Sequence, residues 1–520
     1  MGRIAESASG RDAGPDGEQE RGPGGGRPGR TVAVVGGGVA GTSVILHLVR
    51  TLLEPSGGAG RGPVGSVLLI DPQPAGWGLA FGDTDPLLLC NTAVDINSLL
   101  ADRPFDFVTY LRQHGWTGGE KDCVPRARMA EYCHDRYTWA RERAAAHGID
   151  VRQVRGTAAS IEARGAEGLR IRLDDGRVVR ADGVVVCTGV HRPRTPDGFA
   201  AFAAHPRYLD SPYPAARIRA LRPDSRVLVV GSHQSAVDAS LLLCRDGHRT
   251  TVTSPSGLLP AVRVSLAAPV RDFPPLARIA RLDPADPLLE ERLVRCVVEA
   301  VRLLGPLPLR RQTSRAADPV RRLREETALM EEGACRWAGV MVPLIEAVIA
   351  LAPALPPARR GELAARFGWF TGRYATAVTA VNARRLLACF DSGALRMAAS
   401  YPSAVTFAEG AWRVAAPDGR VERFDSFDYI VNATGYHPPV LHWDRAGSAL
   451  HLGDPPAHAT AVDRLEGDLR VRRAAGAAPE RVWVVGVGTH VRIPFANHLR
   501  NVVRQARQVA RELAGAEVAI

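Results

Sequence analysis

Three glycines near the N-terminus have the spacing of a phosphate-binding turn. Gly36, Gly38 and Gly41 form a G-x-G-x-x-G motif between the apolar run Thr31–Val35 and a stretch with helical spacing. The first glycine of such a motif allows a tight turn, the second lets the backbone approach a pyrophosphate, and the third lets helix and strand pack closely. The phosphates would lie at the helix N-terminus, where free N–H groups and the helix dipole favour negative charge.

An acidic residue closes the next apolar run. Asp71 stands 35 positions after Gly36 (71 − 36), where about 20 is usual, and a Gly/Pro-rich insertion at residues 54–65 accounts for the excess. A carboxylate at this place binds a ribose diol and repels a 2′-phosphate, so the motif suits FAD or NAD rather than NADP. The alternative is a glycine turn that binds no ligand.

A second strand-turn-helix unit begins at residue 226. Gly231 follows the run "RVLVV", and Gln234 and Ser235 open the next helix, where they either touch a dinucleotide phosphate or cap the helix. The following strand ends without a carboxylate. Hydroxyl and guanidinium groups suit a 2′-phosphate, so NADPH is favoured over NADH, and a purely structural unit is the alternative. The residues that we expect to bind this phosphate are Ser254, Ser256 and Arg263.

Two later segments are near-repeats of each other. Residues 182–196 and 428–439 are each an apolar strand that ends in Thr-Gly and is followed by prolines. They resemble the A-T-G segments that connect the FAD and NAD(P)H domains of flavoproteins with two dinucleotide-binding domains. "VWVVGVGTH" resembles the last strand of that family, and the helix after it would point its N-terminus at the flavin. The resemblance gives a cofactor-binding role to Thr188, Gly189, Thr434, Gly435, Gly486 and Gly488.

A narrower resemblance rests on residues 76–116, residues 124–140 and the motif "GSHQSA". These are similar to segments of the flavin-dependent N-hydroxylating monooxygenases, which act on amino acids or amines, and of related FAD/NAD(P)-binding flavoproteins. The resemblance implies FAD and NADPH as cofactors. It also implies hydroxylation of the amino nitrogen of an amino acid or related small metabolite through a C4a-hydroperoxyflavin, in biosynthesis. The alternatives are an NAD(P)H-dependent flavin dehydrogenase or reductase without oxygen insertion, and a flavin-binding scaffold.

Polar residues in these segments are candidates for contact with flavin or substrate. In "LLLCNTAVDINSLL", polar side chains need hydrogen-bond partners if they are buried, although they also suit turn capping. Near the last helix, His490 and Asn497 could face the flavin or the substrate. In the helical region before it, Arg373 could hold a substrate carboxylate or the NADP phosphate. Surface or core positions are the alternatives. The candidates are Asn91, Asp95, Asn97, His490, Asn497 and Arg373. The chemistry itself would be centred on the flavin, without a side-chain triad.

These patterns predict an α/β fold with two dinucleotide-binding, Rossmann-like domains and a helical insert. The expected parts are a disordered leader (1–30), the first part of the FAD domain (31–205), the NADPH domain (206–282), a helical insert that could serve as a substrate lid (283–387) and the second part of the FAD domain (388–520).

Composition limits the class of protein. The formal net charge is +11, but acidic residues are scattered among the arginines, which argues against nucleic-acid binding. The eight cysteines contain no CxxC pair, and this argues against both a metal site and a dithiol reductase. The leader lacks the apolar core of a signal peptide, so we expect a cytoplasmic protein without a membrane segment. Its expected partners are a small amine or amino acid and O₂, and related enzymes are commonly homo-oligomers.

Overall fold

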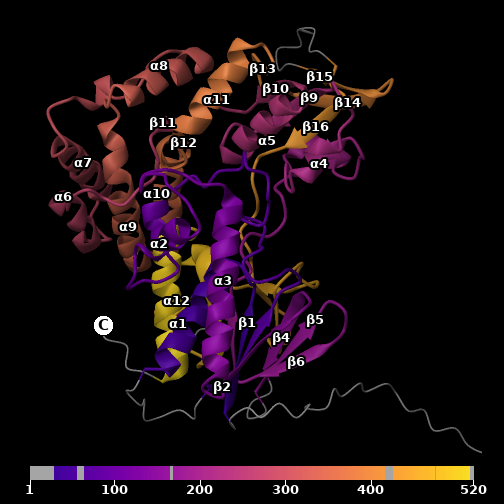
Figure 1. The fold of residues 1–520 in the computed structure, drawn as a ribbon, viewed down its shortest axis with the longest axis vertical. Helices are drawn as coiled ribbons and strands as arrows, with labels where there is room; N and C mark the ends of the chain where they lie inside the picture. Colours follow the sequence, from indigo (N-terminus) through magenta and orange to yellow (C-terminus); the bar gives the residue numbers. More distant parts are fainter. Residues whose placement is uncertain (1–28, 55–63, 164–167, 416–425, 475, 516–520) are drawn as a thin grey trace, which may run out of the picture.

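In the computed structural model, residues 29–54, 64–163, 168–415, 426–474 and 476–515 are described (Figure 1). Residues 1–28 of the predicted leader and residues 55–63 of the Gly/Pro-rich insertion lie outside them.

The first sheet is built around strand β1, which pairs in parallel with β2 and β7. Its order is β20-β21-β7-β1-β2-β3. The strands are β1 (Arg30–Val35), β2 (Val64–Ile70), β3 (Asp150–Val154), β7 (Gly183–Val186), β20 (Arg470–Arg472) and β21 (Pro479–Val484). The central strands β1, β2 and β7 are rich in β-branched residues and largely buried, so they read as continuous apolar runs.

Helices cover one face of this sheet. α1 lies beside both α12 and α3 in Figure 1, and the inward side chains of these three helices share one core with the sheet. The helices on this side are α1 (Val39–Leu52), α2 (Asp106–Gln113), α3 (Arg126–Ala145) and α12 (Leu499–Ala514).

An antiparallel sheet covers the other face. The outward side chains of β1, β2 and β7 share a second core with it. Its order is β19-β17-β18-β4-β5-β6. The strands are β4 (Ala158–Ala163), β5 (Leu169–Leu173), β6 (Val178–Ala181), β17 (His442–Trp443), β18 (Ala449–His451) and β19 (Thr460–Ala461).

The second parallel sheet has the order β13-β10-β9-β16-β8 and packs against helix α5 (Gln234–Arg245). Its strands are β8 (Tyr208–Leu209), β9 (Arg226–Val230), β10 (Arg249–Thr253), β13 (Leu395–Met397) and β16 (Tyr429–Asn432). A short helix, α4 (Ala216–Arg219), and the hairpin of β14 (Ala404–Ala408) and β15 (Ala411–Ala415) flank it.

The boundary predicted at residue 388 is therefore wrong. β13 and β16 lie beyond it, yet they complete the second sheet rather than the first. An apolar strand run does not reveal which of two similar sheets it will join, because the partner strands are distant in the chain.

Helices α6 to α11 form the insert between β11 and β13. They run from residue 274 to residue 391, so they extend beyond both ends of the predicted insert. They are α6 (Pro274–Ala277), α7 (Leu289–Arg302), α8 (Pro319–Glu331), α9 (Met341–Leu351), α10 (Pro357–Phe370) and α11 (Ala380–Asp391). A π-helical turn, Thr371–Ala375, follows α10, and the short parallel pair β11 (Val262–Arg263) and β12 (Val378–Thr379) joins the insert to the second domain.

One segment of the insert, Arg336–Ala354, is long and apolar enough to cross a membrane by length and composition alone. Its most apolar window is 56% buried inside the protein, and its side chains belong to a core of the insert and to a second core that includes Ile96, Leu266 and Ile493 from outside the insert. It therefore packs as a core segment. The α/β fold class with two dinucleotide-binding-type sheets and a helical insert is confirmed.

Candidate functional site: two facing dinucleotide loops

The first glycine loop leaves the N-terminus of α1 open on one side. Gly36 has φ +101°, and a Cβ there would come within 2.4 Å of the Cys187 carbonyl oxygen. A Cβ on Gly41 would lie 1.9 Å from the Gly36 carbonyl oxygen, so helix and strand meet at this point. By contrast, a Cβ on Gly38, the residue that caps α1, would meet no protein atom within 4 Å. This open backbone at a helix N-terminus fits a pyrophosphate.

Asp71 lies beside this loop, as its place after β2 predicts. Its Oδ2 accepts a hydrogen bond from the Gly37 amide at 2.6 Å, and its Oδ1 accepts one from the Gln73 amide at 2.7 Å. The carboxylate is thereby fixed at the edge where β1 and β2 end. An acid, a glycine turn and free helix amides together fit the ribose and phosphates of FAD or NAD.

The second loop repeats the first in detail. The Gly231 amide donates to the Thr253 carbonyl at 2.8 Å, as the Gly36 amide donates to the Ile70 carbonyl at 2.9 Å. Gly231 has φ +121°, and a Cβ there would come within 2.5 Å of the Ala433 carbonyl oxygen. Each of the two glycines therefore packs on the residue just before a Thr-Gly pair.

The segments that follow the two Thr-Gly pairs run side by side between the domains. The His191 amide donates to the His437 carbonyl, and the Arg194 amide donates to the Gly435 carbonyl, both at 2.9 Å. The Thr434 hydroxyl donates to the Arg194 carbonyl at 2.7 Å. Thr188–Gly189 and Thr434–Gly435 thus lie at the paired crossings between the two dinucleotide folds, the place that the near-repeat predicts.

The three residues predicted to hold a 2′-phosphate are not equivalent. The Ser254 and Ser256 hydroxyl oxygens lie 3.3 Å apart just after β10, and Ser256 is exposed. The Arg263 side chain is instead fully buried, and its Nη1 donates to the Tyr374 and Ala375 carbonyls. The predicted phosphate role of Arg263 is corrected on this ground, because a buried guanidinium turned toward the insert offers no donor to that serine pair.

Residues on the first turn of α5 connect the second loop to the insert. The Gln234 side-chain amide donates to the Thr376 carbonyl at 2.8 Å and to the Ala377 carbonyl at 3.2 Å. Ser235 follows on the same turn and is partly exposed. The His233 ring lies beside Gly372, and partial desolvation there lowers its pKa. The π-helical turn of the insert therefore lies directly against the second glycine loop.

The segment "LLLCNTAVDINSLL", residues 87–100, is called the polar block here, and its polar residues fall into two kinds. Both oxygens of Asp95 are used within the protein, by the Lys121 ammonium at 2.6 Å and by the Ala268 amide at 3.1 Å. The predicted flavin contact of Asp95 is corrected for this reason. Asn91 Oδ1 and Asn97 Nδ2 are buried and lack a hydrogen-bond partner in the described structure. Such orphaned groups fit a ligand that supplies both a donor and an acceptor.

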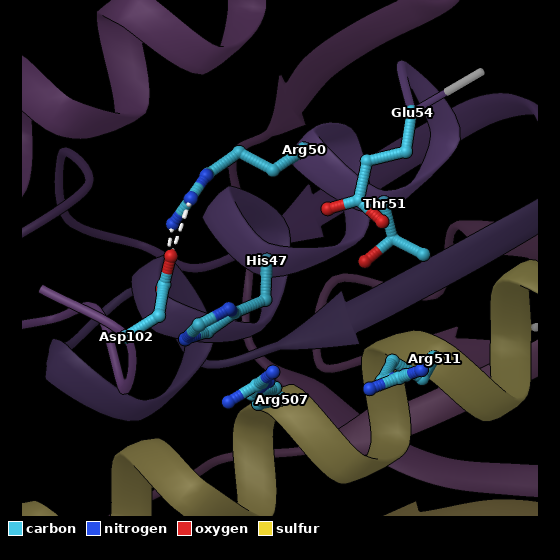
Figure 2. Close-up of a pocket in the computed structure, with 7 residues that line it drawn as sticks. All are labelled: His47, Arg50, Thr51, Glu54, Asp102, Arg507 and Arg511. Carbon is cyan, nitrogen blue, oxygen red and sulfur yellow. Dashed lines mark hydrogen bonds and ion pairs between the residues drawn. The ribbon is translucent and has the colours of Figure 1, made fainter. Parts of the chain in front are cut away.

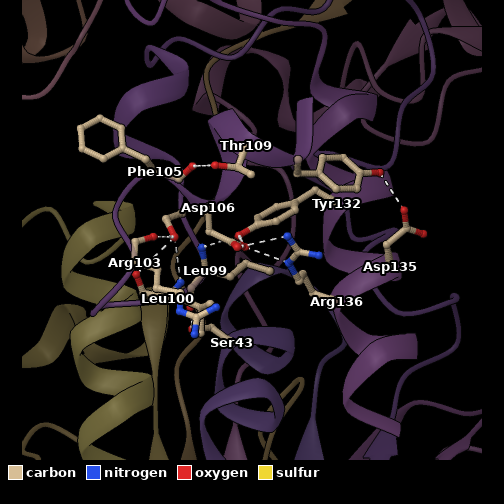
Figure 3. Close-up of polar contacts among 12 residues, drawn as sticks. Ser43, Leu99, Leu100, Arg103, Phe105, Asp106, Thr109, Tyr132, Asp135 and Arg136 are labelled. Atoms are coloured by element: carbon tan, nitrogen blue, oxygen red, sulfur yellow. Dashed lines mark hydrogen bonds and ion pairs between the residues drawn. The ribbon is translucent and has the colours of Figure 1, made fainter. Parts of the chain in front are cut away.

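A network of helix side chains holds this block in place (Figure 3). The Ser43 hydroxyl of α1 donates to the Leu99 carbonyl at 2.8 Å, and the Leu99 amide donates to the Tyr132 hydroxyl at 3.2 Å. Tyr132 in turn donates to Asp106 at 2.6 Å, and Arg136 donates to both oxygens of the same carboxylate. Tyr132 and Arg136 of helix α3 thus fix the position of the polar block. The sequence of this helix resembles the segment that lies beside FAD in the N-hydroxylating monooxygenases.

The turn after the last strand reaches the N-terminus of α1. Gly486 has φ +82°, and a Cβ there would lie 3.2 Å from the Ala40 Cβ, while a Cβ on Gly488 would press on Val484. His490 lies in the same short helix, Gly486–Val491, and burial lowers its pKa. Asn497 is exposed. The structure therefore brings Gly486 against the N-terminus of α1, keeps Gly488 and His490 in the turn that follows it, and leaves Asn497 at the surface.

Arg373 does not hold a free anion. It forms a buried ion pair with Glu326, and its Nη1 donates to the Leu259 carbonyl at 3.0 Å. Glu326 also accepts from the Val262 amide. The predicted role of Arg373 in binding a substrate carboxylate or the NADP phosphate is corrected, because its charge is already neutralised inside the insert.

Residues that hold the two domains together were missed by sequence reasoning. Arg126 of α3 donates to Asp238 of α5 at 2.6 Å and to the Tyr213 hydroxyl at 3.2 Å. Asp85 of the first domain pairs with Arg219 and Arg245 of the second, and its side chain is fully buried. The signal was present in "SAVDASLLL", where one carboxylate interrupts an apolar helix face.

This geometry defines a protein with two linked dinucleotide-binding domains. Residues 33–191 match the model of the FAD-NAD(P)-binding family, so this part of the chain is an FAD-NAD(P)-binding domain. A search of curated proteins found no match.

Two solved structures share the fold over nearly the whole chain. The ornithine hydroxylase of Pseudomonas aeruginosa is 15% identical, with a TM-score of 0.54, over 93% of this chain and 98% of its own. The L-lysine 6-monooxygenase of Pseudomonas syringae is 16% identical, with a TM-score of 0.52, over 93% of this chain and 99% of its own. At this identity the likeness concerns the fold.

Proposed function

We propose that the protein is an FAD-dependent, NADPH-consuming monooxygenase that hydroxylates the amino nitrogen of an amino acid or a related small metabolite. The observation that carries the proposal is the pairing of two glycine loops, each packed on a Thr-Gly segment, across one domain boundary. Two dinucleotide sites in one chain serve hydride transfer from one cofactor to the other. The fold shared with an ornithine hydroxylase and a lysine monooxygenase supports the choice of reaction.

The chain's own residues would bind and orient the cofactors. Gly36, Gly38 and the α1 amides would hold the FAD pyrophosphate, and Asp71 would accept from its ribose. Gly231 and the first turn of α5 would hold the NADPH diphosphate, and the hydroxyls of Ser254 and Ser256 suit its 2′-phosphate. When bound, FAD supplies hydride acceptance and oxygen activation.

The remaining groups would keep water out and place the substrate. Asn91 and Asn97 present unpaired polar atoms inside an apolar block, and the helical insert closes over the second glycine loop through Gln234. A dry, closed site protects a reactive oxygen species from loss to water. We assign the FAD domain to residues 31–205 with the C-terminal strands and α12, and the insert to a lid over the substrate.

The alternative, a flavin reductase without oxygen insertion, is less supported in its dithiol form. Among the described residues all eight cysteines are free of disulfides, and burial raises the pKa of Cys90, to about 12, and of Cys187, the residue that packs on Gly36. The thiols of Cys244 and Cys389 do contact each other, but they lie against the core of the second domain rather than at the first glycine loop. A thiol that stays protonated is a poor nucleophile for disulfide exchange.

The experiment is NADPH oxidation by the FAD-loaded protein with a panel of amino acids and amines, with products analysed by mass. The proposal expects one or more compounds to stimulate NADPH oxidation and to gain one oxygen atom. NADPH oxidation that yields only hydrogen peroxide or a reduced acceptor with every compound would contradict it. The same proposal implies a cytoplasmic enzyme whose partners are the small substrate and O₂, and gel filtration would test the expected homo-oligomer.

A further inference from the structure

Arg263 is a buried cation that has no acidic partner in the described part of the chain. Its side chain is 0% exposed, and no carboxylate in the described ranges forms an ion pair with it. Nη1 donates to the Tyr374 carbonyl at 3.2 Å and to the Ala375 carbonyl at 3.1 Å, both in the π-helical turn. A buried charge with only neutral partners is costly, so its presence calls for a further ligand.

Two donors of this guanidinium remain unsatisfied. Nε and Nη2 of Arg263 are buried and have no hydrogen-bond partner within the described structure. These two N–H groups lie on the same edge of the planar guanidinium, the edge that binds both oxygens of one carboxylate. The neighbouring cation Arg373 differs in this respect, because Glu326 already neutralises it.

The position of Arg263 ties it to the polar block near the first loop. β11 ends at Arg263, and three residues further along the chain the Leu266 carbonyl accepts from the Ala93 amide at 2.8 Å. Arg263 also donates to the Ala375 carbonyl. Two residues further on, the Ala377 carbonyl accepts from the Asn91 side-chain amide at 3.2 Å. The orphaned atoms Asn91 Oδ1 and Asn97 Nδ2 belong to this block.

We propose that Arg263 binds the carboxylate of the substrate through its Nε–Nη2 edge, and that the substrate is therefore an amino acid rather than a simple amine. The unpaired donors suit the carboxylate, and the unpaired acceptor Asn91 Oδ1 suits an ammonium group of the same molecule. This inference rests on the proposed function and adds the substrate class to it.

The charge state agrees with this role. Burial lowers the pKa of Arg263 to about 10, which leaves the guanidinium positive at neutral pH.

The first test uses acetate as the probe on the FAD-loaded full-length protein, with acetamide and chloride at equal concentration as controls. Saturating acetate should raise the Tm of the wild type by about 2 °C or more, and the two controls should not. Arg263→Met should lose this response and should keep or raise the Tm without acetate, because it removes an unpaired buried charge. Arg366→Met, an exposed arginine of the insert, should respond as the wild type does.

The outcomes separate clearly. An acetate response in Arg263→Met equal to that of the wild type overturns the site, and an equal response to chloride overturns its selectivity for carboxylates. If Arg263→Met does not fold, Arg263→Lys decides: it keeps a charge but lacks the two-donor edge, so a full acetate response there overturns the proposal.

The second test compares amino acids with the amines that lack their carboxylate. The amino acid should stimulate NADPH oxidation more than its decarboxylated counterpart, and Arg263→Lys should raise its apparent KM about tenfold or more with a smaller change in kcat. Equal stimulation by both compounds contradicts the inference. NADPH reduction of the flavin is measured separately. If NADPH does not reduce the flavin of the wild type, the proposed function fails, and the acetate result still stands on its own.

Discussion

The Arg126 guanidinium lies 2.6 Å from the Asp238 carboxylate and joins helix α3 of the first domain to helix α5 of the second. The side chains are 15% and 1% exposed, and Tyr213 donates to the same carboxylate. A buried pair of this kind fixes the orientation of one domain on the other more than it adds stability. The two glycine loops therefore have a defined mutual position.

Removing one partner of this pair should destabilise the protein. Asp238→Leu leaves Arg126 buried without its counter-charge, so we expect the free energy of unfolding to fall by about 3–5 kcal/mol. The double variant with Arg126→Met should recover most of this loss, since neither charge remains. Urea unfolding measures both, with the exposed Arg128→Met as control. An unchanged midpoint in the single variant would show that the pair is not closed in solution.

Gly38 should be essential for FAD but not for folding. In Gly38→Asp, the new Cβ meets no protein atom within 4 Å, so the fold should persist, while the carboxylate would repel the pyrophosphate. We expect a folded protein without bound flavin, measured by absorbance and Tm. Gly361→Asp, where a Cβ also meets no neighbour, is the control and should keep its flavin. Full flavin content in Gly38→Asp would refute the assignment of this loop.

The serine pair after β10 should set the preference between NADPH and NADH. Replacing Ser254 and Ser256 with alanine should lower kcat/KM for NADPH about tenfold, because about 1.4 kcal/mol of hydrogen bonding to the 2′-phosphate is lost. The value for NADH should stay the same. Ser392→Ala, at an exposed helix end, serves as control. A wild-type enzyme that uses NADH more efficiently than NADPH would contradict this assignment.

His47 should make the protein acid-sensitive. It is buried between α1 and α12 beside a cavity of about 90 Å³ that is lined by arginines of both helices (Figure 2). Burial lowers its pKa from 6.5 to about 4, with Asp102 opposing this shift and Arg50 and Arg507 adding to it. Between these two pH values the unfolded chain binds a proton that the folded protein does not bind, so the free energy of unfolding falls as pH drops through this window.

The size of this effect is up to about 3 kcal/mol between pH 7 and pH 4. His47→Gln should lose this part of the pH dependence, whereas His147→Gln, an exposed position, should keep it. Chemical unfolding at several pH values measures the difference. An identical pH profile for His47→Gln and the wild type would show that His47 is not held neutral.

Local motifs predicted the parts of the site that depend on local backbone geometry. Gly36, Gly38 and Asp71 were identified from the sequence because a strand, a tight turn and a helix follow each other directly in the chain. The Thr-Gly pairs were found for the same reason, since each closes a strand.

Long-range pairing was not predictable in this way. Arg263 and Arg373 both come from a chain with many arginines. Only the folded structure shows that Arg373 meets Glu326, whereas Arg263 meets no acid among the residues that the structure describes. The same limit explains the misplaced boundary at residue 388. Strand β16 is separated from its neighbour β9 by the whole helical insert, and no local sequence pattern predicts that these two strands pair.

The most direct test of the central claim is anaerobic mixing of the FAD-loaded protein with NADPH, followed by exposure to oxygen. The account predicts that NADPH bleaches the flavin absorbance in a single turnover, that Gly38→Asp shows no such signal, and that oxygen restores the oxidised spectrum. A flavin that stays oxidised with excess NADPH would contradict the account, because the two facing dinucleotide sites would then not be transferring a hydride.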